Sequence, residues 1–190
     1  MANSDIEKFR ELISPRAIIL PETDKSGQNI VELRELQEKD SVIWIKGVPE
    51  ESIIFNLDDF FPAPDQIFAG SKSECCRSDY VIVSNANVEK NIVFIEMKSD
   101  YDDDYAHMKN QLRGAYSFMG YCQTILDAFW KYTFSFDKYD KHYVICTRTS
   151  KKWTKKFDRN QPANTDVENP LKLEGSNQYP FNRLIGRKPR

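Results

Sequence analysis

Two strongly apolar strand segments followed by a long helix constrain the fold of this chain more than any other feature. Residues 79–83 and 91–98 are rich in Val, Ile and Phe, and a polar turn separates them. Apolar or small residues then recur in alternating steps of three and four from Tyr105 to Phe129, which is typical of one continuous helix face. A hairpin of buried strands with a helix long enough to cross it predicts an α/β domain.

The other elements complete an α/β pattern built on a mixed sheet. Three further segments have the β-branched and aromatic content of strands: 41–46, 52–57 and 142–147. Residues 28–39 have the moderately amphipathic pattern of a helix. At 190 residues the chain suits one domain. We expect that domain over residues 1–160, followed by an irregular, basic C-terminal tail over residues 161–190 that is rich in Asn, Pro and Gly.

Composition excludes several classes of protein. Hydrophobic residues make up 40% of the chain and charged residues 29%, which is typical of a folded protein and not of a disordered one. The 4 Cys form no C-x-x-C pair, so a zinc ribbon or a dithiol motif is excluded. No glycine spacing makes a phosphate-binding loop, and no G-x-S-x-G elbow is present. The 2 His disfavour hydrolases that need several histidines.

The N-terminal residues are polar, and no apolar run approaches the roughly 18–20 residues that a membrane span needs. We therefore expect no signal peptide and no membrane association. The expected location is the reducing cytoplasm, where the cysteines are free thiols.

Charge is distributed unevenly along the chain. Residues 1–140 carry 15 Lys and Arg against 25 Asp and Glu, whereas residues 141–190 carry 12 against 4. The basic part begins with cations interleaved with an aromatic residue, and these are Arg148, Lys151, Lys152, Trp153, Lys155 and Lys156. Such a segment can bind nucleic acid through phosphate contacts and base stacking. A solvated basic face that balances the acidic body explains the pattern equally well.

Acidic and basic side chains come together on one face of the predicted hairpin. Residues two apart in a strand share a face, so Glu96 and Lys98 lie side by side. If the turn is centred between residues 87 and 88, Asp79 lies directly opposite Glu96. Facing carboxylates have Cβ atoms only about 4.5–5.5 Å apart and repel each other, which a divalent cation with oxygen ligands would offset. A Glu-x-Lys pair alone is usually a solvated charge pair, but the facing Asp79 favours a metal site in which Lys98 orients or deprotonates water.

These residues resemble a known family. Ser78-Asp79 in a strand, then Phe94-Ile95-Glu96-Met97-Lys98, then a long helix and a strand, are similar to the PD-(D/E)xK nuclease superfamily. The resemblance covers roughly residues 28–147. It implies the restriction-endonuclease-like fold, an α/β three-layer core with a mixed β-sheet flanked by helices.

The resemblance also implies a catalytic site. In that family the aspartate and the glutamate, here Asp79 and Glu96, bind Mg²⁺ or Mn²⁺. The backbone carbonyl of Met97 would be a further metal ligand, and Lys98 would be the catalytic lysine.

Many members of the family add two more residues. One is an acidic metal ligand on an early helix, for which Glu35 and Glu32 rank slightly ahead of Asp58 and Glu74. The other is a catalytic glutamine on the helix after the lysine, here Gln111.

The resemblance therefore implies a metal-dependent nuclease that hydrolyses phosphodiester bonds, with DNA favoured over RNA as substrate. Restriction or antiviral (phage) defence is the expected setting, with control by a regulatory protein partner or by a homodimer. The alternative is a catalytically inactive nuclease-fold subunit that has a structural or nucleic-acid-binding role in a larger complex. The presence of Asp79, Glu96 and Lys98 together favours the enzyme.

Overall fold

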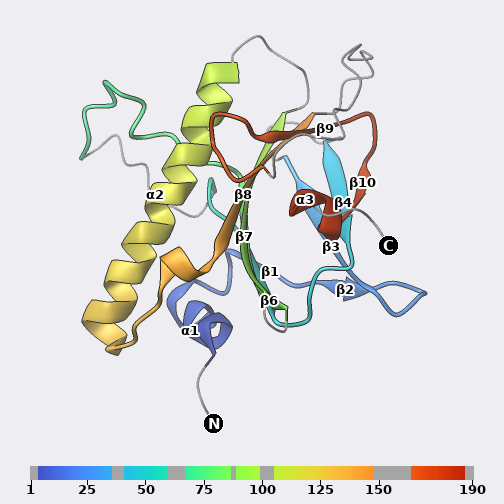
Figure 1. Ribbon diagram of the computed structural model, residues 1–190, viewed down its shortest axis with the longest axis horizontal. Helices are drawn as coiled ribbons and strands as arrows, with labels where there is room; N and C mark the ends of the chain where they lie inside the picture. The colour runs from blue at the N-terminus through green and yellow to red at the C-terminus, as the bar shows by residue number, and fades with distance from the viewer. Residues whose placement is uncertain are drawn as a thin grey trace.

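Two β-sheets and a long helix form the domain in the computed structural model (Figure 1). The structure describes residues 4–35, 41–59, 67–86, 89–98, 105–147 and 164–186. The expected α/β class is confirmed, with two mixed sheets and flanking helices. No helix in the described ranges combines the length and the apolar character needed to cross a membrane.

The larger sheet has six strands, and its centre is the hairpin expected from the sequence. Its order is β1 (Ile18–Ile19), β5 (Ser52–Asn56), β6 (Tyr80–Ala86), β7 (Glu89–Lys98), β8 (Asp140–Thr147) and β9 (Leu171–Glu174). Strands β5, β6 and β7 are antiparallel neighbours, whereas β7, β8 and β9 run parallel. Tyr80 pairs with Ile95 and Val81 with Phe94, which confirms the predicted register.

Helix α2 (Tyr105–Trp130) covers one face of this sheet. Its buried residues follow the predicted stripe and are Met108, Leu112, Ala115, Met119, Cys122 and Leu126. Phe129 was expected to extend this stripe, but its side chain is 78% exposed, so the buried face ends one turn earlier. A Cβ at Gly114 would lie 1.7 Å from the Cys76 carbonyl oxygen, so the absence of a side chain there lets the segment before β6 pass directly against the helix.

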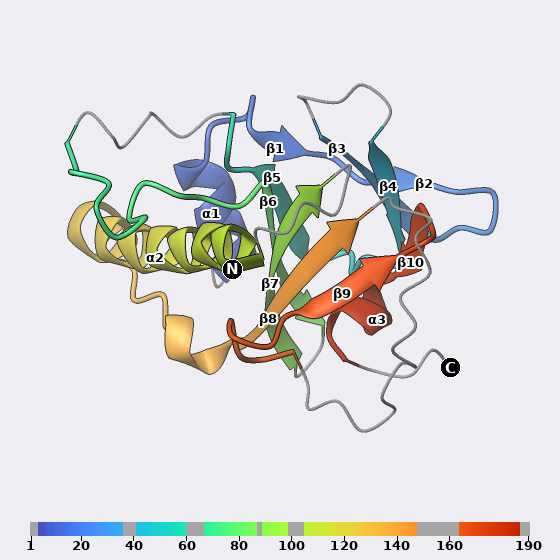
Figure 2. The ribbon, with the colours of Figure 1, turned by 90° about the horizontal axis from the view of Figure 1, so that it is seen from above.

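Helix α1 (Asp5–Leu12) lies on the same side of the sheet as α2, as Figure 2 shows. This helix was not among the elements expected from the sequence, although Ser4 and Glu7 form a capping box at its start. The aromatic rings of Phe9 and Phe134 meet edge to face at 4.8 Å in the core beneath it.

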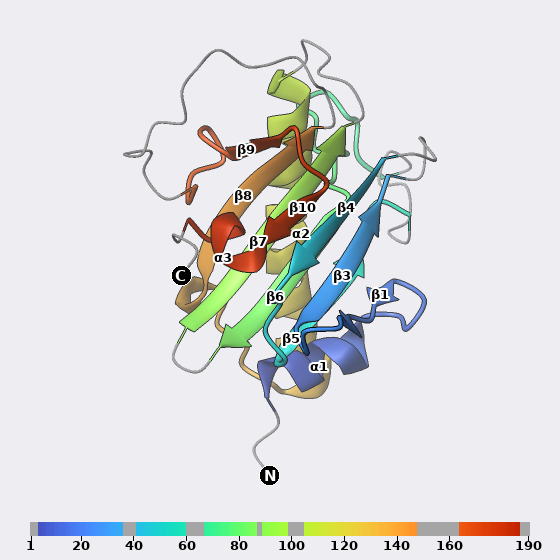
Figure 3. The same cartoon turned by 90° about the vertical axis from the view of Figure 1, so that its right-hand side faces the viewer.

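A second, four-stranded sheet covers the opposite face (Figure 3). Its order is β10 (Gln178–Pro180), β4 (Val42–Lys46), β3 (Asn29–Arg34) and β2 (Glu22–Thr23). Helix α3 (Phe181–Leu184) packs with it. The larger sheet therefore lies between a helical layer and the smaller sheet, and both of its faces are buried.

The helix expected over residues 28–39 is wrong in its described part. Residues 29–34 form β3, in which Val31 and Leu33 are buried and alternate with the more exposed Glu32 and Arg34. Over so short a stretch the apolar pattern fits both the helical and the strand period, and antiparallel pairing with β4 decides in favour of the strand.

The irregular C-terminal tail expected over residues 161–190 is also wrong in its described part. Strand β9 extends the larger sheet and β10 extends the smaller one, both by parallel pairing. Leu173, Tyr179 and Leu184 are buried in the core between the sheets. Asn169, Pro170, Gly175 and Asn177 lie between the short elements, and this segment belongs to the packed domain.

Candidate active site

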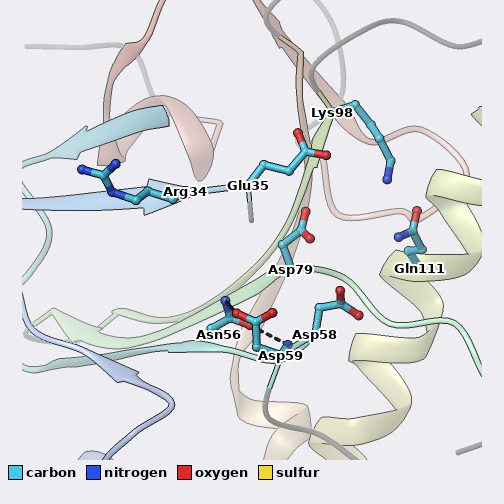
Figure 4. A pocket seen from close by; sticks show the side chains of 8 residues that line it. All are labelled: Arg34, Glu35, Asn56, Asp58, Asp59, Asp79, Lys98 and Gln111. Atoms are coloured by element: carbon cyan, nitrogen blue, oxygen red, sulfur yellow. Dashed lines mark hydrogen bonds between the residues drawn. The ribbon is translucent and has the colours of Figure 1, made fainter. Parts of the chain in front are cut away.

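A small acidic cavity opens where several strands end beside α2 (Figure 4). Eight residues from β3, β5, β7, α2 and the segments next to β3, β5 and β6 line it: Arg34, Glu35, Asn56, Asp58, Asp59, Asp79, Lys98 and Gln111. Because β6 runs antiparallel to both β5 and β7, its first residue lies at the edge where those two strands end. This arrangement collects carboxylates from distant parts of the chain.

Asp79 is fixed directly before β6 by two backbone hydrogen bonds. Its carbonyl oxygen accepts from the Leu57 N–H at 2.8 Å, and its Oδ2 accepts from the Met97 N–H at 2.6 Å. The second bond holds Asp79 against the end of β7. The register of the hairpin, continued by one residue beyond Tyr80, sets Asp79 opposite Glu96, as the sequence predicts.

Glu96 is fully buried on the face of β7 that packs against α2. Its Oε1 lies 3.0 Å from Lys98 Nζ, and its Oε2 has no hydrogen-bond partner among the described residues. Burial, and then the neighbouring Asp79, raise the pKa of Glu96 well above its usual range. A carboxyl group this poorly compensated is costly unless a proton or a cation neutralises it.

The pKa values of Asp79 and Lys98, the two charged groups beside Glu96, are also shifted by burial and by one another. Burial raises the pKa of Asp79 to about 7, although the Met97 N–H and Lys98 both lower it. Burial lowers the pKa of Lys98, but Glu96, Asp79 and Glu35 outweigh it and raise the value above normal. Lys98 is therefore a cation at neutral pH, and it balances only part of the acidic charge around it.

Gln111 reaches the cavity from α2, and its Oε1 is buried with no hydrogen-bond partner in the described part of the chain. The sequence-based choice of this glutamine thus coincides with a residue that lines the cavity. Because α2 packs on the sheet through Leu112 and Met108, the adjacent Gln111 is fixed relative to β7.

Glu35 also lines the cavity, but it does so from a different element than expected. It directly follows β3 and donates its backbone N–H to the Ser41 carbonyl, at 2.9 Å, so it is not on an early helix. The competing Glu32 forms an ion pair with Arg34 on β3 and does not line the cavity. Glu74 accepts from the Lys72 N–H at 2.7 Å and also lies outside the cavity lining.

Two aspartates after β5 extend the acidic wall. Asp58, one of the four acidic residues weighed from the sequence, accepts from Arg77 Nε at 2.9 Å. Asp59, which the sequence analysis missed, accepts from Asn56 Nδ2 at 2.8 Å, and burial followed by the charge of Asp58 raises its pKa. The position of Asp59 at the end of a predicted strand, on the same edge as Asp79, is the signal that could have identified it.

The donors at this site fit a hard divalent cation. Asp79 and Glu96 offer adjacent carboxylates, and Glu96 Oε2 and Gln111 Oε1 are buried oxygens without a hydrogen-bond partner in the described ranges. No three His, Cys, Asp or Glu side chains of the described residues converge as a ready-made metal cage. One or two carboxylates, completed by water and substrate phosphate, are however the usual way in which proteins bind Mg²⁺.

All the catalytic and metal-binding roles predicted from the sequence remain predictions. The Met97 carbonyl was expected to be a metal ligand, whereas the contact seen at this residue is the N–H bond to Asp79. The nucleic-acid-binding residues lie outside the described residues, and they are Arg148, Lys151, Lys152, Trp153, Lys155 and Lys156.

No protein-family model, curated protein or solved structure matches this chain. The functional assignment therefore rests on the geometry and electrostatics of the cavity.

Proposed function

We propose that this protein is a metal-dependent nuclease with the restriction-endonuclease-like fold, and that it hydrolyses phosphodiester bonds of DNA, with RNA as the second candidate substrate. The observation that supports this most strongly is the pairing of Asp79 with the fully buried Glu96, beside Lys98, at an edge of the sheet. A structural role does not explain why two poorly compensated carboxyl groups are held together in this way.

In this proposal Asp79 and Glu96 hold Mg²⁺ or Mn²⁺, with the Met97 carbonyl and Glu35 as further ligands. The metal ion, when bound, polarises the scissile phosphate and lowers the pKa of a bound water. Lys98 is cationic at neutral pH, so it acts as a hydrogen-bond donor that orients the attacking water and stabilises charge developing on the phosphate.

Gln111 has a buried carbonyl oxygen that can accept a hydrogen bond from the same water. The helix α2 that carries it is anchored to the sheet, so this acceptor is positioned before substrate arrives. The cavity itself repels phosphate, because most of its charged residues are acidic. Substrate affinity must then come from cations elsewhere, and residues 148–156 are the proposed nucleic-acid-binding segment.

The proposal includes a cytoplasmic enzyme of restriction or phage defence, held in check by a regulatory partner or by dimerisation. An unregulated nuclease would cleave the DNA of its own host, which is the reason to expect such control.

A catalytically inactive subunit is the second candidate. The ion pair between Lys98 and Glu96, together with the lack of a three-residue metal cage in the described residues, is the observation in its favour. In that case the site would neither bind Mn²⁺ nor require it for nucleic-acid binding.

The deciding experiment incubates the purified protein with plasmid DNA, single-stranded DNA and RNA in Mg²⁺, Mn²⁺ or EDTA. We expect metal-dependent cleavage that Glu96→Gln reduces by about 10²–10³-fold, because the substitution removes a charged ligand but keeps the side-chain shape. Glu32→Gln, which changes a nearby glutamate outside the cavity, should cleave like the wild type. Wild-type protein that neither cleaves nor binds Mn²⁺ would support the inactive subunit instead.

A further inference from the structure

Tyr80 directly follows Asp79 in the sequence and connects the cavity to the second sheet. Successive residues of a strand point to opposite faces, so Asp79 faces α2 while the ring of Tyr80 is buried between the two sheets, where it is 2% exposed. Its hydroxyl reaches β3. There it donates to the Arg34 carbonyl oxygen and accepts from the Arg34 N–H at 3.1 Å.

The position of Arg34 in β3 explains why these backbone groups need such a partner. Glu35 bonds to Ser41 across the hairpin with β4, so the N–H and C=O of the preceding Arg34 point to the opposite edge of β3. On that edge β2 pairs only with Asn29 and Ile30. The Tyr80 hydroxyl therefore satisfies, among the described residues, both backbone groups that a neighbouring strand would otherwise bind.

We infer that Tyr80 is a positioning residue that fixes Glu35 beside Asp79, so that the two sheets together form one metal site. This inference rests on the proposed function. Tyr80 is covalently joined to Asp79, and Arg34 is covalently joined to Glu35. The two hydrogen bonds between Tyr80 and Arg34 thus connect Glu35, directly after a strand of the smaller sheet, to Asp79, directly before a strand of the larger one. The path runs through four residues.

The chemistry of the hydroxyl suits this role. A tyrosine hydroxyl keeps its proton at neutral pH, so it remains both a donor to the Arg34 carbonyl oxygen and an acceptor from the Arg34 N–H. The ring belongs to the apolar core cluster between the sheets, which includes Val31 of the smaller sheet and Ile82 of the larger one. It therefore has little freedom to move away from Arg34.

Mn²⁺ binding to the protein, measured by titration calorimetry, tests the inference. We expect Tyr80→Phe, which removes only the hydroxyl, to weaken Mn²⁺ binding about tenfold, as is typical when a residue that orients a metal ligand is lost. Glu35→Gln should weaken it by a similar factor. Because Tyr80 acts through Glu35, the double variant should bind no more weakly than Glu35→Gln alone.

Tyr179→Phe is the matched control. Tyr179 is buried in the same core cluster, and its hydroxyl has no hydrogen-bond partner in the described part of the chain. This variant should bind Mn²⁺ like the wild type.

A second measurement does not depend on the folding of Tyr80→Phe. By linkage, Mg²⁺ bound through Glu35 should slow hydrogen exchange of the Arg34 amide in the wild type, and this slowing should be absent in Glu35→Gln.

The outcomes separate the inference from the proposed function. Wild-type protein that binds Mn²⁺ through Asp79, together with Tyr80→Phe of equal affinity or a double variant with fully additive losses, overturns the positioning role alone. An Arg34 amide whose exchange is unaffected by Mg²⁺ has the same consequence. Wild-type protein that binds no Mn²⁺, or binds it unchanged in Asp79→Asn, overturns the proposed function and this inference together.

Discussion

Two groups of buried carboxyls lie at opposite ends of the β6–β7 hairpin, and their surroundings differ in kind. Asp5 is almost fully buried at the start of α1, yet it contacts Lys90 Nζ at 2.6 Å and accepts from the hydroxyls of Tyr132 and Tyr139, each at 2.7 Å. Burial raises the pKa of Asp5, but these partners outweigh it and bring the value below normal.

At the other end of the hairpin, Asp79 and Glu96 share one lysine, and burial raises the pKa of both. The comparison teaches that burial alone does not identify a functional carboxylate. Asp5 has enough donors to remain charged, which is what a structural group requires. Asp79 and Glu96 lack enough donors, which leaves oxygen atoms for a cation to bind.

The largest expected effect is on the free energy of unfolding, which should change in opposite directions when the aspartate at each end of the hairpin is replaced by asparagine. Asp5→Asn should lower the free energy of unfolding by about 3 kcal/mol, because it leaves Lys90 and two hydroxyls without their charged acceptor. Asp79→Asn should raise it by about 1 kcal/mol, because the charge is lost while the amide oxygen can still accept the Met97 N–H bond. Urea denaturation at pH 7 in EDTA measures both, and shifts in the same direction would contradict the comparison.

The pH dependence of stability sharpens the same contrast. Folded Asp79 keeps its proton up to a pKa of about 7, whereas the unfolded chain releases it near 3.8, so the folded state binds more protons between these values. Stability should therefore fall, by an amount on the order of 3 kcal/mol, as pH rises from about 4 to about 7.

Denaturation of the wild type and of Asp79→Asn across this pH range, in EDTA, isolates that contribution. The variant should lack it, and identical slopes for the two proteins would count against a raised pKa. Asp5 has the opposite dependence. Its pKa is lowered on folding, so its contribution is present above pH 3.8 and is lost as pH falls through the folded value.

Added metal should stabilise the protein by binding only at the end of the hairpin that carries Asp79 and Glu96. At a Mg²⁺ concentration ten times the dissociation constant, the free energy of unfolding should rise by about 1.4 kcal/mol. Glu96→Gln should abolish this rise. Asp5→Asn should retain it in full, since Asp5 lies at the other end of β7. Thermal denaturation with and without Mg²⁺ measures the effect, and a rise that survives Glu96→Gln would place the binding elsewhere.

The smallest expected effect comes from removing one donor to Asp5. Tyr132→Phe should lower the free energy of unfolding by about 1 kcal/mol, because the carboxylate keeps Lys90 and Tyr139. Cleavage activity and Mn²⁺ affinity should not change. A loss of metal affinity in this variant would show that the two ends are coupled, contrary to the comparison.

Much of the candidate site could be predicted because its central residues are close together in the chain. The turn between β6 and β7 is short, so the spacing of Asp79 and Glu96 fixes their pairing once the alternation of the strands is recognised. The buried stripe of α2 could be predicted equally well, because the period of a helix is a local property of the sequence.

The errors in the β-strands concern pairings between distant segments. Residues 29–34 became β3 because β4 was available beside them, and residues 171–174 became β9 because β8 offers a parallel edge. Asp58 and Asp59 join the cavity only because β5 and β7 end at the same edge of the sheet. A local pattern carries no information about which distant edge will be free.

The hairpin, its register and the grouping of Asp79, Glu96 and Lys98 on one face follow from local sequence patterns. Only the packed structure buries Glu96 fully and brings Glu35 to the same cavity as Asp79. The physical reason is the range of the interactions. Strand alternation and turn length act between near neighbours in the chain, whereas desolvation and contacts between sheets exist only after the whole chain has packed.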